Sequence, residues 1–173
     1  MTTPNDFDDA DWILPDWPAP AGVGSLATTR RGGVSIGAFA SLNLGDHVGD
    51  DPASVAANRE IVRRRIGTRP VWLGQVHGTR VIDAARMSEP FPPEADAAFT
   101  RETGVACTVM TADCLPVLFC DQAGTVVAAA HAGWRGLLAG VLEATITAMA
   151  VPGRELIVWL GPAIGAQAFE VGG

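Results

Sequence analysis

The stretch that decides the fold is Pro116–Gly136, which reads PVLFCDQAGTVVAAAHAGWRG. Two short apolar runs, at 116–120 and 125–131, flank the turn-forming residues Asp121-Gln122-Ala123-Gly124. This pattern predicts an antiparallel hairpin. The second run ends in one of only three histidines in the chain, followed by glycine, tryptophan and arginine. We therefore expect the hairpin to present a functional group at its open end.

The length of the turn predicts which residues of the two strands face each other. A four-residue loop pairs Cys120 with Thr125 and, counting back along both strands, pairs Cys114 with His131. A two-residue loop gives the same pairing, whereas a three-residue loop with a bulge at Gly124 shifts it by one residue. Directly opposed Cβ atoms lie about 4.5–5.5 Å apart. At that separation, the thiol and imidazole can bind one metal ion or act as a nucleophile and its base.

The rest of the chain shows alternating strand and helix signals. We expect further strands at 23–30, 71–77, 81–83, 105–110 and 156–160, and helices from Asp51-Pro52 to near Gly67 and over 136–150. Residues 30–51 and 86–95 are predicted loops. The order of these elements predicts an α/β (α+β) fold, a single domain with mixed, largely buried β-sheet layers flanked by helices.

Composition limits the class of protein. The chain has 173 residues and a net charge of −7, which argues against nucleic acid as a partner. It has neither an apolar run long enough to span a membrane nor a recognisable leader, so we expect a cytoplasmic protein and no membrane partner. The three cysteines, an odd number, indicate reduced thiols. Cys107 and Cys120, within predicted strands, are interpreted as buried, inert thiols.

The two ends of the chain differ in character. Residues 1–20 are rich in proline and aspartate, and we expect them to form a flexible N-terminal segment. Residues 21–173 are expected to form the single domain. Because a glycine-rich stretch follows the strand pattern at 156–160 and the chain then stops, we expect this domain to lack its C-terminal part.

His77 is a third candidate ligand beside Cys114 and His131. It ends an apolar strand pattern within GQVHG, residues 74–78. Two imidazoles and one thiolate with one open position are typical of a catalytic zinc site, although the chain spacings match no local motif. Such a site lowers the pKa of a bound water or polarises a substrate oxygen. His47, flanked by aspartates, is interpreted as an exposed loop histidine.

Arg135 follows His131 by four residues, in a glycine turn that leads into a predicted helix. A helix N-terminus together with a guanidinium favours an anion such as phosphate or a carboxylate. An equally open interpretation is that the arginine covers the Trp134 ring or forms a surface ion pair.

The sequence resembles the laccase-domain family, also called the peptidoglycan-editing-factor or purine nucleoside phosphorylase family and formerly the multicopper polyphenol oxidoreductase family. The matching stretches occur in the same order from about residue 23 to the end: SLNLG (41–45), NR (58–59), GQVHG (74–78), ADAAFT (95–100), TADCLPVLFCD (111–121), AAAHAGWRG (128–136) and GPAIGAQAFEVG (161–172). The resemblance implies that His77, Cys114 and His131 are zinc ligands. These are the residues that the hairpin and the donor types already indicate.

The resemblance also implies an activity. It points to a cytoplasmic, zinc-dependent purine nucleoside phosphorylase that acts on adenosine, inosine and methylthioadenosine, with adenosine deaminase activity. A small-molecule nucleoside and phosphate would then be the partners. We expect Arg135 and Arg59 to hold phosphate, and Asn43 and Gln75 to make polar contacts with the nucleoside.

The chain departs from the family at two positions and in length. Many members carry cysteine and tyrosine where this chain has Ala163 and Phe169, and the family continues past its last residue. These differences bear on the wall and the completeness of the substrate pocket, and therefore on the activity of this chain alone. The oligomeric state stays open.

Three alternative functions remain. One is a hydrolase that edits a peptidoglycan precursor, either with zinc or with Cys114 as nucleophile and His131 as base. Another is a copper polyphenol oxidase, since two histidines and a cysteine also suit blue copper. A multicopper enzyme needs further imidazoles, however, and this chain has three histidines in total. The third is a non-enzymatic binding domain, in which the presence of three candidate metal ligands would be a coincidence.

Overall fold

The structure is a computed structural model that describes residues 11–87 and 92–170. Within these ranges, residues 11–16 and 24–68 form one compact unit, and residues 17–23 and 69–170 form a second. Residues 1–10 of the expected flexible segment 1–20 lie outside the described residues, and its remainder includes the short strand β1. In the described part of the chain, no helix has the length and apolar character needed to cross a membrane.

The first unit combines a small sheet with one long helix. Strand β1 (Trp12–Ile13) pairs antiparallel with β2 (Ala27–Thr28), and the 3-10 turn η2 spans Gly37–Phe39. Helix α1 (Pro52–Ile66) matches the prediction at both ends. The Asp51 carboxylate accepts hydrogen bonds from two backbone N–H groups of the first turn, and Gly67 ends the helix with φ +67°. The predicted strand at 23–30 is real only at β2, where it has two residues.

Asn58 of α1 orders the long loop that precedes the helix. Its side chain is completely buried. The Nδ2 group donates to Ser35 Oγ and to the carbonyl oxygens of Ser41 and Asn43, at 2.8–3.1 Å. These bonds satisfy the amide and replace the ladder bonds that a loop lacks. One helix residue therefore fixes most of the predicted loop at 30–51.

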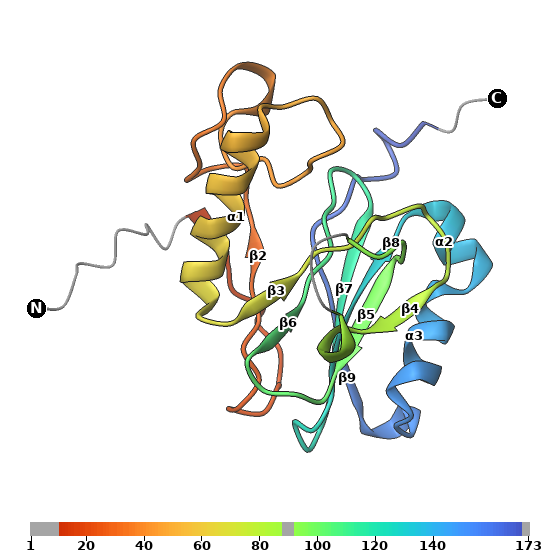
Figure 1. Ribbon diagram of the computed structural model, residues 1–173. Helices are drawn as coiled ribbons and strands as arrows, with labels where there is room; N and C mark the ends of the chain where they lie inside the picture. The colour runs from red at the N-terminus through yellow and green to blue at the C-terminus, as the bar shows by residue number, and fades with distance from the viewer. Residues whose placement is uncertain (1–10, 88–91, 171–173) are drawn as a thin grey trace, which may run out of the picture. The chain divides into compact units, whose positions relative to one another are not determined.

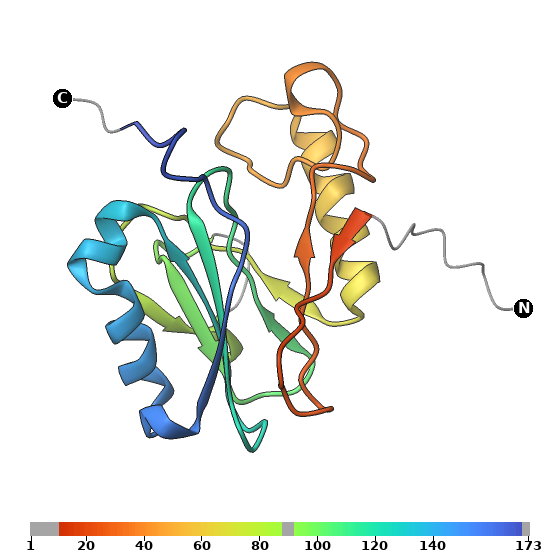
Figure 2. The ribbon, with the colours of Figure 1, turned by 180° about the vertical axis from the view of Figure 1, so that it is seen from behind.

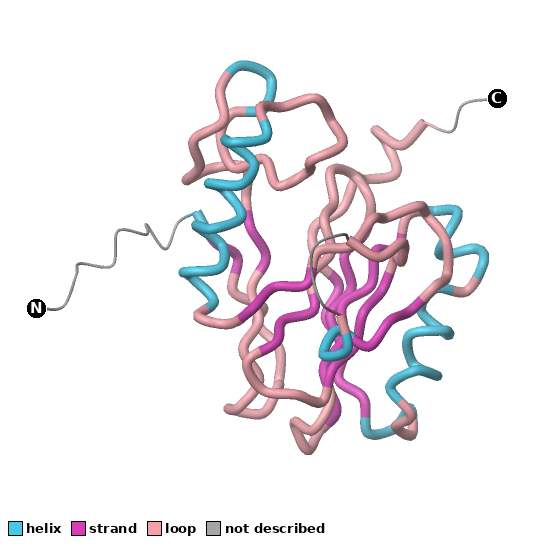
Figure 3. The backbone as a smooth tube through the Cα atoms, in the orientation of Figure 1, coloured by secondary structure: helices cyan, strands magenta, loops and turns pink. Residues whose placement is uncertain are grey.

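The second unit is built on a mixed five-stranded sheet in the order β4-β5-β8-β7-β9 (Figures 1 and 3). The strands are β4 (Val81–Asp83), β5 (Ala97–Thr100), β8 (Val127–Ala132), β7 (Leu115–Asp121) and β9 (Leu156–Leu160). β4 and β5 are parallel, and the other neighbours are antiparallel. A separate parallel pair joins β3 (Arg69–Val71) to β6 (Val105–Cys107). Helices α2 (Trp134–Ala139) and α3 (Val141–Met149) and the 3-10 turns η3 (Ala84–Arg86) and η4 (Gly153–Glu155) complete the unit.

The alanine-rich strand β8 separates two apolar cores. Ala128, Ala130 and Ala132 belong to a core that includes Val141 and Met149 of α3, which runs beside the sheet (Figure 2). On the opposite face of the sheet, Ile82 of β4 and Ala98 of β5 belong to a second core, which also includes Val71, Leu73, Ala84 and Ala95. Because side chains alternate along a strand, His131 lies on this second face. The expected mixed, largely buried sheet with flanking helices is confirmed.

The predicted register of the hairpin is wrong by two residues. β7 and β8 do form a hairpin, but Cys120 pairs with Val127 and His131 pairs with Pro116. The loop between the strands covers residues 122–126, five residues rather than the predicted four, because Asp121 still belongs to β7 and β8 begins at Val127. The Asp121 carboxylate accepts hydrogen bonds from the N–H groups of Thr125 and Val126. Since the shift is two residues, the face of each predicted side chain is unchanged.

Three further elements differ from the prediction. Of the strand expected at 71–77, only Val71 lies in a regular strand, at the end of β3; Gly74 forms an isolated bridge with Glu94, and the N–H groups of residues 76–78 bind a side chain. The helix expected over 136–150 is two helices, since Gly140 adopts φ +97° and ends the first. Strand β5 was not predicted, because it is only four residues long and begins with two alanines, which are depleted in strands.

Candidate metal centre

Three side chains from separate segments converge at one end of the five-stranded sheet. His77 lies in the loop after β3, Cys114 immediately before β7, and His131 near the end of β8. One donor atom from each lies within 4.8 Å of the others. Cys114 Sγ is 3.8 Å from His77 Nε2, and the two imidazole centroids are 4.7 Å apart with the rings nearly perpendicular. The structure thus brings together the three residues expected as ligands. Cys114 lies just outside the β7–β8 ladder, however, and is not the strand partner of His131.

The donor set fits a tetrahedral zinc ion. With bonds of about 2.0–2.1 Å to nitrogen and about 2.3 Å to sulfur, tetrahedral donors lie about 3.3–3.7 Å apart. The Sγ–Nε2 distance of 3.8 Å is close to this range. The largest distance between two of the three donor atoms is at most 4.8 Å, and it would have to shorten by about 1 Å for both atoms to bind one zinc ion. Two imidazoles and one thiol leave a fourth position open for water or substrate.

Gly133 leaves room for these donors. Its φ of −62° is accessible to any residue, so backbone conformation does not require glycine here. A Cβ atom at this position would lie 2.7 Å from His77 Cδ2 and 3.0 Å from Cys114 Sγ. Both distances are shorter than van der Waals contact. The glycine after strand β8 is therefore needed for the close approach of two candidate ligands.

Asp96, immediately before β5, connects two of the candidate ligands and is fully buried. Its Oδ1 accepts a hydrogen bond from the His77 N–H at 2.9 Å and lies 2.8 Å from His131 Nδ1. Its Oδ2 accepts from the N–H groups of Gly78 at 2.7 Å and Val76 at 3.2 Å. Sequence reasoning missed this residue. The available signal was an acidic residue inside the otherwise small, apolar stretch ADAAFT.

The thiol environments distinguish Cys114 from the other cysteines. Burial, followed by the nearby Asp113 and Asp96 carboxylates, raises the pKa of Cys114. These groups disfavour a thiolate unless a cation binds beside it, the reverse of what a metal-free nucleophile needs. Burial, and then Asp83, raise the pKa of Cys107 to about 12. All three cysteines are free, as expected, and Cys120 is completely buried.

Gln75 ties the segment carrying His77 to the segment carrying Cys114. Its Nε2 donates to the Met110 carbonyl oxygen, and its Oε1 accepts from the Met110 N–H, each at 2.7 Å. Both ends of the Gln75 side-chain amide are thus bonded to the Met110 backbone. Gln75 therefore positions the two ligand segments, and its contact with a nucleoside stays a prediction.

Asn43 and Arg59 both belong to the first unit. The Asn43 amide bonds to both backbone groups of Gly45 and donates to the Asp50 carboxylate. Arg59 donates to the Leu44 carbonyl oxygen at 2.9 Å and pairs with Asp46 at 3.2 Å. Both side chains thus stabilise the loop before α1. Their expected contacts with nucleoside and phosphate stay predictions.

Arg135 is exposed at the start of α2. Its guanidinium carbon lies 4.5 Å from the centroid of the Trp134 ring. This is the stacking that was one of the two open interpretations. A stacked guanidinium still presents its N–H groups at its edges, so an anion contact stays a prediction.

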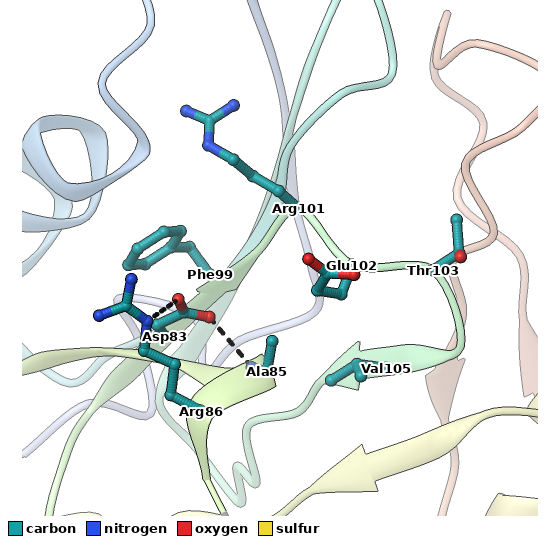
Figure 4. Close-up of a pocket in the computed structure, with 8 residues that line it drawn as sticks. All are labelled: Asp83, Ala85, Arg86, Phe99, Arg101, Glu102, Thr103 and Val105. Atoms are coloured by element: carbon teal, nitrogen blue, oxygen red, sulfur yellow. Dashed lines mark hydrogen bonds and ion pairs between the residues drawn. The ribbon is translucent and has the colours of Figure 1, made fainter.

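A surface hollow lies elsewhere in the second unit, toward the far ends of β4 and β5 (Figure 4). Its lining residues are Asp83, Ala85, Arg86, Phe99, Arg101, Glu102, Thr103 and Val105. Arg86 pairs with Asp83 at 3.1 Å, and Arg101 donates to the Met149 carbonyl oxygen at 2.6 Å. Protein groups thus bind both arginines, and none of the three converging donors lines this hollow.

Comparison with known proteins decides the family. Residues 24–173 match the family described as multi-copper polyphenol oxidoreductase laccase. The chain belongs to this laccase-domain family. The match confirms the resemblance carried by the sequence motifs, and it includes all three converging donors.

Named relatives and solved structures in the laccase-domain family are closely similar. Purine nucleoside phosphorylase PA4543 of Pseudomonas aeruginosa is 61% identical over 164 residues, covering 94% of this chain and 66% of the relative. Purine nucleoside phosphorylase YfiH of Escherichia coli is 53% identical, covering 93% and 67%. The crystal structure of Neisseria meningitidis protein NMB0706 gives a TM-score of 0.90 at 59% identity, covering 94% and 66%. The chain thus spans about two thirds of the length of these laccase-domain relatives.

Proposed function

We propose that His77, Cys114 and His131 bind a zinc ion, and that the protein is a purine nucleoside phosphorylase. The observation that carries the proposal is the convergence of three donor atoms within 4.8 Å. Relatives that are 47–61% identical carry the name purine nucleoside phosphorylase, which supports a nucleoside and phosphate as substrates. The substrates proposed from the sequence are adenosine, inosine and methylthioadenosine.

Phosphorolysis sets clear requirements for the chain. A phosphate oxygen bonds to C1′ of the ribose while the bond from C1′ to the purine nitrogen breaks, and the purine leaves with a proton. Bound zinc supplies a Lewis acid at the open position. Arg135 is our candidate for holding phosphate, because an exposed guanidinium can bind phosphate oxygens in a bidentate manner.

We propose adenosine deamination as a second activity of the same centre. The oxygen of a water molecule replaces the amino group at purine C6, and ammonia leaves. Other zinc deaminases also hold their metal with histidine and cysteine, which supports this assignment. The two activities would yield adenine and inosine from adenosine, so their products can be separated.

The alternatives receive less support from the centre. A metal-free cysteine hydrolase acting on a peptidoglycan precursor needs a thiolate, whereas burial and two carboxylates raise the pKa of Cys114. Copper suits the donor set, and the family description names it. Within this chain, the single histidine left after His77 and His131 is His47, so these residues alone do not form an additional imidazole-rich copper cluster.

The experiment measures the zinc content and the nucleoside turnover of the full-length protein. We expect near-stoichiometric zinc and, with adenosine and phosphate, formation of adenine and inosine. Cys114→Ala removes one donor, so zinc content should fall below one half and turnover by about 100-fold or more. Cys107→Ala is the matched control and should retain both. Full zinc content and turnover in Cys114→Ala would contradict the proposal, and copper with blue absorption would favour the oxidase.

A further inference from the structure

We infer that Asp96 is the positioning residue of the centre: it fixes the tautomer of His131 and the backbone of His77 together. The inference rests on the proposed metal site. It goes beyond that site because Asp96 contacts two of its ligands without being one of them. A single buried carboxylate thereby determines the direction of two of the three donors.

The first half of the inference concerns the proton on His131. An ionised carboxylate has acceptors only, so the imidazole nitrogen 2.8 Å from Asp96 Oδ1, Nδ1, carries the hydrogen. Nε2 then has a free lone pair for a metal ion. The Asp96 carbonyl oxygen also accepts from the His131 N–H at 2.7 Å. Main chain and side chain of one residue thus hold the imidazole in a metal-binding state.

The second half concerns the loop that carries His77. This residue has φ +60°, a left-handed conformation that non-glycine residues adopt infrequently. The three successive N–H groups of Val76, His77 and Gly78 all point at the Asp96 carboxylate. Successive N–H groups turned toward one anion form a concave binding arrangement that stabilises such a backbone. Without the Asp96 carboxylate, these three hydrogen bonds are lost and no longer offset the energetic cost of the left-handed backbone at His77.

Asparagine at position 96 cannot reproduce this arrangement. If its NH₂ group replaces Oδ2, it faces the N–H groups of Val76 and Gly78, and donors oppose donors. If it replaces Oδ1, it donates to His131 Nδ1 and moves the imidazole proton to Nε2, which then cannot bind metal. Either orientation weakens the site while the volume of the side chain is unchanged.

The first test measures the tautomer of His131 in the metal-free protein by ¹⁵N NMR, in a pH series carried upward until the spectrum of each histidine no longer changes. The three histidines are assigned with His47→Gln and His77→Gln. We expect Nδ1 to be protonated and Nε2 bare. A protonated Nε2, or an even mixture of tautomers, would overturn the inference. This measurement needs neither metal nor activity, and it decides the question even if the Asp96 variant does not fold.

The second test compares zinc affinity in Asp96→Asn with that in Asp121→Asn, by competition with a chelator. Asp121 is the matched control, because it is another buried carboxylate that binds backbone N–H groups of a loop, at the other end of β7. We expect a 10- to 100-fold loss for Asp96→Asn, the usual effect of removing a partner of a metal ligand, and less than about 3-fold for the control. Equal affinities would overturn the inference. If the unaltered protein binds no zinc, the proposed function fails, while the tautomer result stands separately.

Discussion

Asp96 and Asp121 each hold the backbone of a loop, and they lie at opposite ends of the five-stranded sheet. Each is nearly or fully buried, and each carboxylate accepts hydrogen bonds from backbone N–H groups of a loop. Asp121 closes its loop with Thr125, which donates to it through both its N–H and its hydroxyl group. Asp96 also faces an imidazole, His131.

The two carboxylates differ in what they bind: one binds a single loop, and the other also binds a candidate metal ligand. At the hairpin end the carboxylate serves only the loop that follows it in the chain. At the ligand end it joins a loop and a strand that are about 50 residues apart in the sequence. Substitutions with the same chemistry at both ends should therefore have the same kind of effect on stability but different effects on metal binding.

The largest expected effect comes from glycine substitution. In Gly133→Ala the new Cβ would overlap His77 Cδ2 at 2.7 Å and Cys114 Sγ at 3.0 Å. Displacing two donors by about 1 Å should lower turnover on the order of 100-fold. Because φ is −62°, the fold should persist. Zinc affinity, turnover and the circular dichroism spectrum together check this outcome.

Gly124→Ala at the hairpin end is the control for this prediction. Gly124 has φ +69°, so alanine is strained there, but the nearest atoms to its Cβ would be those of Pro20 and Val23, at 3.4 Å and beyond. We expect a loss of about 1 kcal/mol in the free energy of unfolding and unchanged zinc affinity. Full zinc affinity in Gly133→Ala would show that the centre is less tightly packed than the structure indicates.

A smaller effect is expected for Asp121→Asn, measured as the free energy of unfolding against pH. Burial raises the pKa of Asp121, but hydrogen bonds from Thr125 and Val126 outweigh it, and the net pKa is lowered from 3.8. The carboxylate therefore stabilises the fold fully above pH 3.8, and this contribution is lost as pH falls through the lowered value. Asp121→Asn should cost about 1–3 kcal/mol at neutral pH and flatten this acid dependence. An unchanged acid profile would contradict the assignment.

Much of the fold could be predicted from local signals. Helix α1 begins at a capping aspartate followed by proline and ends at glycine, and each signal acts within a few residues. The β7–β8 hairpin was likewise predicted from its apolar runs and turn. Its register was not, because Asp121 lies in the strand while its side chain binds the loop, and sequence alone does not show which end a turn residue joins.

The candidate site divides in the same way. His77, Cys114 and His131 were found by their residue types and by family motifs. Asp96 was missed together with β5, since a four-residue strand that begins with two alanines gives no strong pattern. Its partners lie about 20 residues before it and 35 residues after it, so only the folded sheet brings them together. Gln75 was predicted to touch substrate, whereas its bonds to Met110 depend on a backbone 35 residues away.

The smallest expected effect compares two glutamines. Gln75 makes two hydrogen bonds with the Met110 backbone at the ligand end, and Gln122 donates one to the Arg154 carbonyl oxygen, at 3.1 Å, at the hairpin end. Gln75→Ala should lower the free energy of unfolding by about 1–2 kcal/mol, and Gln122→Ala by about 0.5 kcal/mol, because the latter bond is exposed.

Zinc affinity separates the two glutamines more clearly than stability. Loss of the contact between the segments carrying His77 and Cys114 should weaken zinc binding by a few-fold in Gln75→Ala, below the about 10- to 100-fold of a direct partner such as Asp96. Gln122→Ala should leave it unchanged. If Gln75→Ala instead abolishes nucleoside turnover while zinc affinity stays intact, the side chain acts on substrate as the sequence suggested, and its bonds to Met110 are secondary.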